Sequence, residues 1–162
     1  MSVKPIPEGY HTVTPYLIVK GAAKALDFYK AAFGATELVR MPGPDGRICH
    51  AEIKIGDSHI MLAEECPEMG AKDPQTLGGS PIGICLYVED VDTRYAQAIA
   101  AGGTVKRAVQ NQFYGDRSGC LIDPFGHNWT IGTHIEDVAP EEMSRRMAAW
   151  AQQQAQKQPD AA

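Results

Sequence analysis

The chain carries an internal repeat, and this feature restricts its fold more than any other. Residues 16–35 (YLIVKGAAKALDFYKAAFGA) and 85–104 (CLYVEDVDTRYAQAIAAGGT) both read as an apolar strand, a short break, an amphipathic helix and a glycine stop. In this alignment Leu17 matches Leu86 and Gly34 matches Gly103. Strand-like segments follow each copy, so the spacing predicts two β-α-β-β-β halves.

The segment CHAEIKI, which follows the first helix, shows the clearest strand alternation. Cys49, Ala51 and Ile53 share one face, and His50 and Glu52 share the other. We expect the apolar face to pack against the helices and the polar face to stay accessible.

The repeat and its flanking segments predict one domain covering residues 1–162. Its parts are a first module at 11–63, a linker at 64–82, a second module at 83–135 and a C-terminal helix at 139–152. The linker is rich in proline and glycine. The helix has one apolar stripe, formed by Met143, Met147 and Trp150.

Composition narrows the possible partners and compartment. The net charge is −5 and basic residues form no cluster, which argues against nucleic-acid binding. No apolar run reaches the roughly 18 residues of a membrane span, and the start lacks the apolar core of a secretory signal. The four cysteines form no C-x-x-C pair, so we expect reduced, mostly buried thiols in a cytoplasmic protein.

Five stretches carry a family resemblance when they are taken in order. They are PYLIVKGAAKALDFYKAAFGA, MPGPDGRICHAEIKIGDSHIMLAEE, GGSPIGICLYVEDVD, FYGDRSGCLIDPFGHNW and THIEDVAPEEM. Together they resemble the vicinal oxygen chelate superfamily of glyoxalases, bleomycin-resistance proteins and extradiol dioxygenases, in its PhnB-like branch, over about residues 11–147. The resemblance implies an α+β fold in which two paired βαβββ modules form a cup-shaped mixed sheet, with an added C-terminal helix.

Superfamily members with metal chemistry hold a divalent ion in the cup, where it polarises substrate oxygens. Alignment through DFY and DPFG places the four usual ligand positions at Thr14, Gly83, Met61 (or Ile60, one residue off) and Thr130. None of these residues offers an imidazole or a carboxylate. The resemblance therefore implies no metal cofactor at the usual site.

Side-chain alternation from these positions predicts which strand residues line the cup and contact a ligand. They are Thr14, Tyr16, His50, Glu52, His59, Met61, Cys85, Tyr87, Asn128 and Thr130. Arg117, in the segment FYGDRSG that reads as a loop, is a further candidate. His50, Glu52 and His59 could instead form a rearranged metal site, or His50 and Glu52 a hydrogen-bonded pair on a solvated face. Arg117 could clamp an anionic ligand or pair with Asp116 or Asp123 to hold the nearby turn.

The turn in LIDPFGHNWTIGTH poses a separate question about His127. A metal role and a structural role are both open, and we favour a structural ring that hydrogen-bonds backbone near the turn.

Three functions are consistent with these patterns. The leading hypothesis is a homodimer that binds a small organic molecule in the cup, without metal, nucleic acid or membrane. The alternatives are a metal-dependent lyase, isomerase or dioxygenase using His50, Glu52 and His59, and an accessory dimer whose cup is filled by its own side chains.

Overall fold

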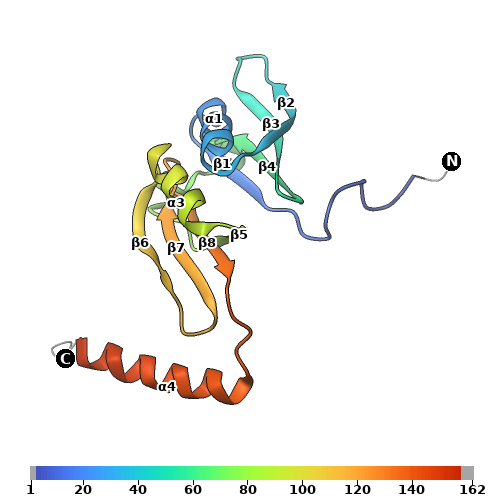
Figure 1. Cartoon of the computed structure of the whole chain (residues 1–162). Coiled ribbons are helices and arrows are strands. Elements are labelled where there is room, and N and C mark those ends of the chain that lie inside the picture. The colour runs from blue at the N-terminus through green and yellow to red at the C-terminus, as the bar shows by residue number, and fades with distance from the viewer. Residues whose placement is uncertain (1–2, 158–162) are drawn as a thin grey trace.

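The computed structural model describes residues 3–157, which fold into two modules of the same order (Figure 1). The first module consists of β1 (Tyr16–Val19), α1 (Ala22–Phe33), β2 (Thr36–Pro42), β3 (Ile48–Ile55) and β4 (Ser58–Glu64). The second consists of β5 (Gly83–Tyr87), α3 (Val91–Ala100), β6 (Thr104–Asn111), β7 (Asp116–Ile122) and β8 (Asn128–His134). The predicted α+β fold of two βαβββ modules is confirmed.

Each module forms its own four-stranded mixed sheet. The strand orders are β1-β4-β3-β2 and β5-β8-β7-β6, and the first strand of each pairs in parallel with the last. The equal order of the two sheets explains the sequence repeat.

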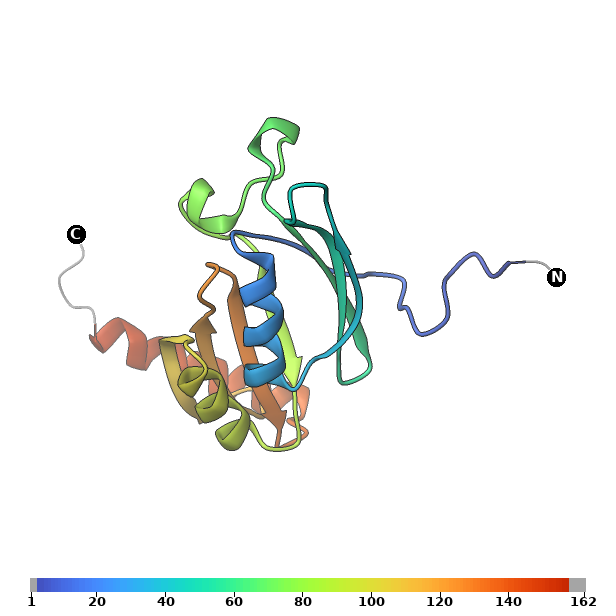
Figure 2. The ribbon, with the colours of Figure 1, turned by 90° about the horizontal axis from the view of Figure 1, so that it is seen from above.

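The two modules share one hydrophobic core, which the helices fill. Helix α1 lies between the two sheets and contacts α3, which covers β6, β7 and β8 (Figures 1 and 2). Phe33 of α1 packs on Trp129 of β8 with ring centroids 4.4 Å apart, and Tyr29 lies 5.7 Å from the same ring. The halves therefore cannot be separated without exposing large aromatic surfaces.

Helix α1 is held at both ends by features of its own module. The backbone N–H groups of Gly21 and Ala22 each donate to the carboxylate of Glu64 at 2.7 Å. A negative charge at this end satisfies free N–H groups and complements the helix dipole. The helix ends at Gly34, whose φ of 68° is left-handed and easily adopted by glycine.

The faces of β3 follow the predicted alternation except at its start. Ala51 and Ile53 are buried, but Cys49 is exposed and Ile48 takes the buried position. A register shift in the pairing of β2 with β3, between Met41 and Pro42, produces this change. The expectation of mostly buried thiols is likewise wrong, because Cys85 is also exposed.

The remaining segments connect or extend the modules. The linker contains a 3-10 turn, η1 (Pro67–Met69), and one helical turn, α2 (Pro74–Leu77). Helix α4 (Pro140–Lys157) extends away from the sheets and is longer than predicted (Figure 1). Among the helices of residues 3–157, none combines the length and apolarity needed to cross a membrane.

Candidate functional site

The polar face of the first sheet gathers most of the residues predicted for the first module. Strand register places Tyr16 and Glu52 on either side of Met61, and His59 opposite Lys54. Directly paired residues share a face, so these side chains lie opposite the buried face of the sheet.

A chain of hydrogen bonds connects the polar side chains on this face. The Tyr16 hydroxyl lies 3.0 Å from His50 Nδ1, and His50 Nε2 lies 3.1 Å from Glu52 Oε1. The hydroxyl of Tyr10 donates to the other oxygen, Glu52 Oε2. Bonds from Tyr10 and His50 lower the pKa of Glu52, so its carboxylate is ionised at neutral pH. The ionised Glu52 accepts a hydrogen bond from His50 Nε2–H, which leaves Nδ1 to accept a hydrogen bond from the Tyr16 hydroxyl.

His59 lies on the same face but does not join this chain. Its ring stacks on Tyr10, with centroids 4.2 Å apart and planes 17° apart, and the side chain is 9% exposed. Its Nδ1 is buried without a hydrogen-bond partner. Across residues 3–157, no three His, Cys, Asp or Glu side chains group closely enough to hold a metal ion. The geometry therefore does not assemble the alternative metal site of His50, Glu52 and His59.

The second sheet carries a separate polar cluster on the corresponding face. The register pairs Cys85 with Thr130 and Gly83 with Asn128, so Cys85, Asn128 and Thr130 share one face. The Tyr87 hydroxyl donates to Asp116 Oδ2 at 2.7 Å, and this bond raises the pKa of Tyr87 to about 12.

His134 extends this cluster toward the C-terminal segment. Its Nδ1 lies 2.8 Å from Asp116 Oδ1, and its Nε2 lies 2.9 Å from Asp137 Oδ1. Hydrogen bonds to Asp116 and then Asp137 raise the pKa of His134.

Thr130 and Asn128 are engaged by neighbouring side chains on the same face. Thr130 Oγ1 lies 3.4 Å from the sulfur of Cys120, and Asn128 accepts from Lys106 Nζ at 3.0 Å. Asn128 also donates to the carbonyl oxygen of Ser80.

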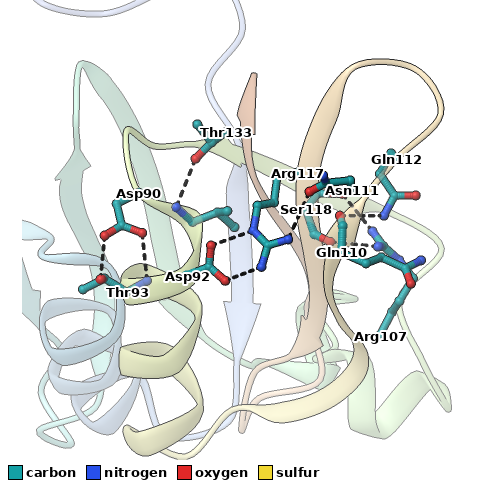
Figure 3. Close-up of polar contacts among 11 residues, drawn as sticks. Asp90, Asp92, Thr93, Arg107, Gln110, Asn111, Gln112, Arg117, Ser118 and Thr133 are labelled. Carbon is teal, nitrogen blue, oxygen red and sulfur yellow. Dashed lines mark hydrogen bonds and ion pairs between the residues drawn. The ribbon is translucent and has the colours of Figure 1, made fainter. Parts of the chain in front are cut away.

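Arg117 does not lie with these residues, which corrects the expectation that it lines the cup. Arg117 pairs with Thr133 in the sheet, three residues after Thr130. An odd separation places the two residues on opposite faces, so Arg117 lies on the face that α3 covers. Its guanidinium binds both carboxylate oxygens of Asp92 at 2.7 and 2.6 Å (Figure 3). It pairs with neither Asp116 nor Asp123, and it fastens α3 to β7.

His127 has a structural role that reaches beyond its own turn. Its Nε2 lies 3.0 Å from the carbonyl oxygen of Ile18 in β1, so the ring bonds backbone as expected, but in the other module. Its backbone N–H donates to Asp123 Oδ1 at 2.9 Å.

Asp123, the first residue of the DPFGH turn, is a buried hub that the sequence did not reveal. Oδ1 accepts from the N–H groups of Phe125 and His127, and Oδ2 accepts from the Tyr29 hydroxyl and Trp129 Nε1, each at 2.9 Å. The residue is 3% exposed. The sequence signal for this role was the aspartate at the start of the DPFGH turn. Its partner on α1, Tyr29, could not be identified from sequence spacing.

The predicted ligand residues are distributed over several hollows. His59, Cys85 and Tyr87 border one of about 410 Å³, which lies between the modules. Thr14, Glu52 and Met61 border a second of about 570 Å³. Asn128 and Thr130 border a third of about 490 Å³, and Tyr16 borders a fourth of about 440 Å³.

Comparison with known proteins gives concordant results for sequence and fold. Residues 10–131 match the model of the Glyoxalase/Bleomycin resistance protein/Dioxygenase superfamily. The uncharacterized protein Mb0911c of Mycobacterium bovis is 44% identical over 140 residues, covering 85% of this chain and 92% of the relative.

Solved structures share the fold at lower sequence identity. The protein PA1353 of Pseudomonas aeruginosa superposes with a TM-score of 0.64 at 23% identity, covering 78% of this chain and 99% of the other. A PhnB protein of Bacillus cereus, described as a putative 3-demethylubiquinone-9 3-methyltransferase, gives 0.60 at 17% identity, covering 76% and 99%.

Proposed function

Because the chain belongs to the glyoxalase/bleomycin resistance protein/dioxygenase superfamily, we propose that it is a cytoplasmic homodimer that binds a small organic molecule on the polar faces of its sheets. The observation that carries the proposal is the chain from Tyr16 through His50 to Glu52. It fixes the orientation of three polar side chains on a face that does not contribute to the core. Fixed polar groups beside apolar surface are typical of a ligand site.

The donor set at the superfamily's metal positions does not fit the usual ion. Gly83 has no side chain, and Thr14 and Thr130 offer only neutral hydroxyls. The thioether of Met61 suits soft metals and is a poor ligand for a hard divalent ion. The proposed function accordingly uses hydrogen bonds and apolar contact for binding.

The homodimer is supported by the openness of the polar faces. Tyr16 is 49% exposed and Tyr87 65% exposed, and Met41, which pairs with His50 in the sheet, is also exposed. Large apolar and aromatic side chains grouped on a surface favour association. A second copy placed against these faces would bring separate hollows together into one enclosed site, with an isologous interface.

The cytoplasmic location is supported by the cysteines. All four, Cys49, Cys66, Cys85 and Cys120, are free thiols in the structure. Unpaired, partly exposed thiols are typical of a reducing compartment.

A second candidate, an acid–base enzyme, is favoured by the connection of Tyr16 to Glu52 through His50. A half-exposed hydroxyl that donates to a carboxylate-oriented imidazole can relay a proton from a substrate to His50. Loss of turnover in His50→Gln with retained ligand binding would support this reaction, and unchanged turnover would exclude His50 as its base.

Methyl NMR of protein labelled at methionine tests the proposed function directly. A library of small organic molecules should contain compounds that stabilise the protein in thermal shift. Those compounds should move the Met61 methyl signal and leave Met147 on α4 unchanged as an internal control. Sedimentation should give a dimer, and elemental analysis after dialysis with Zn²⁺, Mn²⁺, Ni²⁺ and Fe²⁺ should give well under one ion per chain. Absence of any Met61 response would instead favour an accessory dimer, and one retained ion per chain would favour metal chemistry.

A further inference from the structure

The N-terminal segment rests on the polar face of the first sheet through one half-buried side chain. We call residues 3–13 the N-terminal strap. Within it only Tyr10 is half-buried, and the other residues are exposed. A second polar contact of the strap joins the exposed side chains of His11 and Asp57, whose Nε2 and Oδ2 atoms lie 3.6 Å apart. An attachment this limited costs little free energy to open.

The surface beneath Tyr10 has the components of a binding site. The carboxylate of Glu52 accepts the Tyr10 hydroxyl, and the ring of His59 lies flat against the Tyr10 ring. The Glu52 side chain is held by His50, which is held in turn by Tyr16. The acceptor and the stacking surface are therefore in place before any ligand arrives.

His59 adds an independent sign that this site is incomplete without another molecule. The residue is 9% exposed, and its Nδ1 is buried without a hydrogen-bond partner. Buried polar atoms are nearly always satisfied, so an orphan beside a stacked ring points to a missing partner. Tyr10 supplies the ring contact but no group for this atom.

We propose that this site binds a neutral hydroxylated aromatic small molecule, and that Tyr10 occupies the site in the ligand-free protein and leaves it when the ligand binds. The inference rests on the proposed function and names its ligand class. Tyr10 acts as an internal ligand, because its phenol makes two of the contacts that the incoming molecule makes. The ligand hydroxyl donates to Glu52 and its ring stacks on His59. A second polar group of the ligand reaches His59 Nδ1, the atom that Tyr10 leaves without a partner. A carboxylate-bearing ring is disfavoured in this position, because its charge would face that of Glu52.

The surroundings allow both the exchange and a ligand larger than a phenol. The hollow of about 570 Å³ bordered by Thr14, Glu52 and Met61 adjoins Tyr10. Gly9 has a φ of 83°, and a Cβ built there would lie 3.0 Å from His59 Cε1. Glycine therefore allows the strap to pass close to the His59 ring. Residue 9 also has no side chain that would pack on this ring and hinder release of the strap.

Tyr10→Ala tests the proposal by vacating the site, with 4-fluorophenol and 4-fluorotoluene as matched probes in ¹⁹F NMR titrations. The variant should bind 4-fluorophenol at least about tenfold tighter than the wild type, because the internal competitor is gone. It should prefer 4-fluorophenol over 4-fluorotoluene by roughly ten- to hundredfold, the usual effect of a hydrogen bond to a charged group. Tyr10→Ala combined with Glu52→Gln should lose most of this preference.

Equal affinities of folded Tyr10→Ala for the two probes, or no binding of 4-fluorophenol, would overturn the proposal. If Tyr10→Ala does not fold, Tyr10→Phe replaces it, since it keeps the ring and lacks only the hydroxyl. This variant should bind 4-fluorophenol more tightly than the wild type, and an unchanged affinity would overturn the proposal. The methionine NMR response of the wild type tests the broader function separately, so a Met61 response without phenol preference rejects only the ligand class.

Discussion

The imidazole of His127 joins the second module to the first, because its Nε2 lies 3.0 Å from the carbonyl oxygen of Ile18, 109 residues earlier. His127 is 9% exposed, and its bond to Ile18 is part-buried. Leaving a partly buried carbonyl without its partner has a cost that solvent cannot fully offset.

We therefore expect His127→Ala to lower the free energy of unfolding by about 1–3 kcal/mol. Urea denaturation followed by circular dichroism measures this change. His11→Ala is the matched control, because His11 is an exposed histidine and its loss should change stability by less than about 0.5 kcal/mol. Equal stability of His127→Ala and the wild type would show that the bond contributes nothing to the docking of the modules.

Asp123 connects the same turn to α1 through Tyr29 and to β8 through Trp129. Replacing it with alanine leaves four buried donors without an acceptor, so Asp123→Ala should destabilise the protein by about 3–5 kcal/mol. Tyr29→Phe removes one of these donors and should cost about 1–2 kcal/mol. The double variant should cost clearly less than the sum of the two, because the lost bond is shared. Additive effects would mean that the Tyr29 hydroxyl and Asp123 act independently.

The sequence allowed the module order and many side-chain faces to be predicted for a physical reason. Strand alternation and helix periodicity are local properties, so they placed His50 and Glu52 on one face and predicted the repeated βαβββ order correctly. The contacts of Tyr10 with Glu52 and of Tyr29 with Asp123 join segments 42 and 94 residues apart, and no local pattern encodes them.

Arg117 shows where local reasoning failed at the start of a strand. The segment FYGDRSG reads as a loop, but β7 begins at Asp116, so Arg117 lies inside the strand and its face is fixed by the sheet. The observed pairing of Cys120 with Thr130 places Arg117 on the opposite face, where Asp92 of α3 neutralises it. A one-residue change in register moves every side chain of a strand to the other face.

Glu64 should stabilise the start of α1 by capping it from β4. Glu64→Gln keeps the size of the side chain but removes its charge, so we expect a loss of about 0.5–2 kcal/mol in the free energy of unfolding. Glu89→Gln, at an exposed position, is the control and should have an effect below about 0.5 kcal/mol. Thermal denaturation of both variants in the same buffer gives the comparison. Similar small losses for the two would indicate that the N–H groups of Gly21 and Ala22 are satisfied equally well without the charge.

His134 should make the stability of the C-terminal connection depend on pH. Hydrogen bonds to Asp116 and Asp137 raise its pKa in the folded protein, so the folded state binds a proton more tightly than the unfolded state. The stabilisation is fully present below the unfolded value of about 6.5 and is lost as pH rises through the folded pKa. The stability difference between the wild type and His134→Gln should therefore be largest below about pH 6.5 and shrink at higher pH. Denaturation midpoints measured from pH 5 to 9 test this, with His11→Gln as the control, and a difference that grows with pH would show that the charged form of His134 is not the stabilising one.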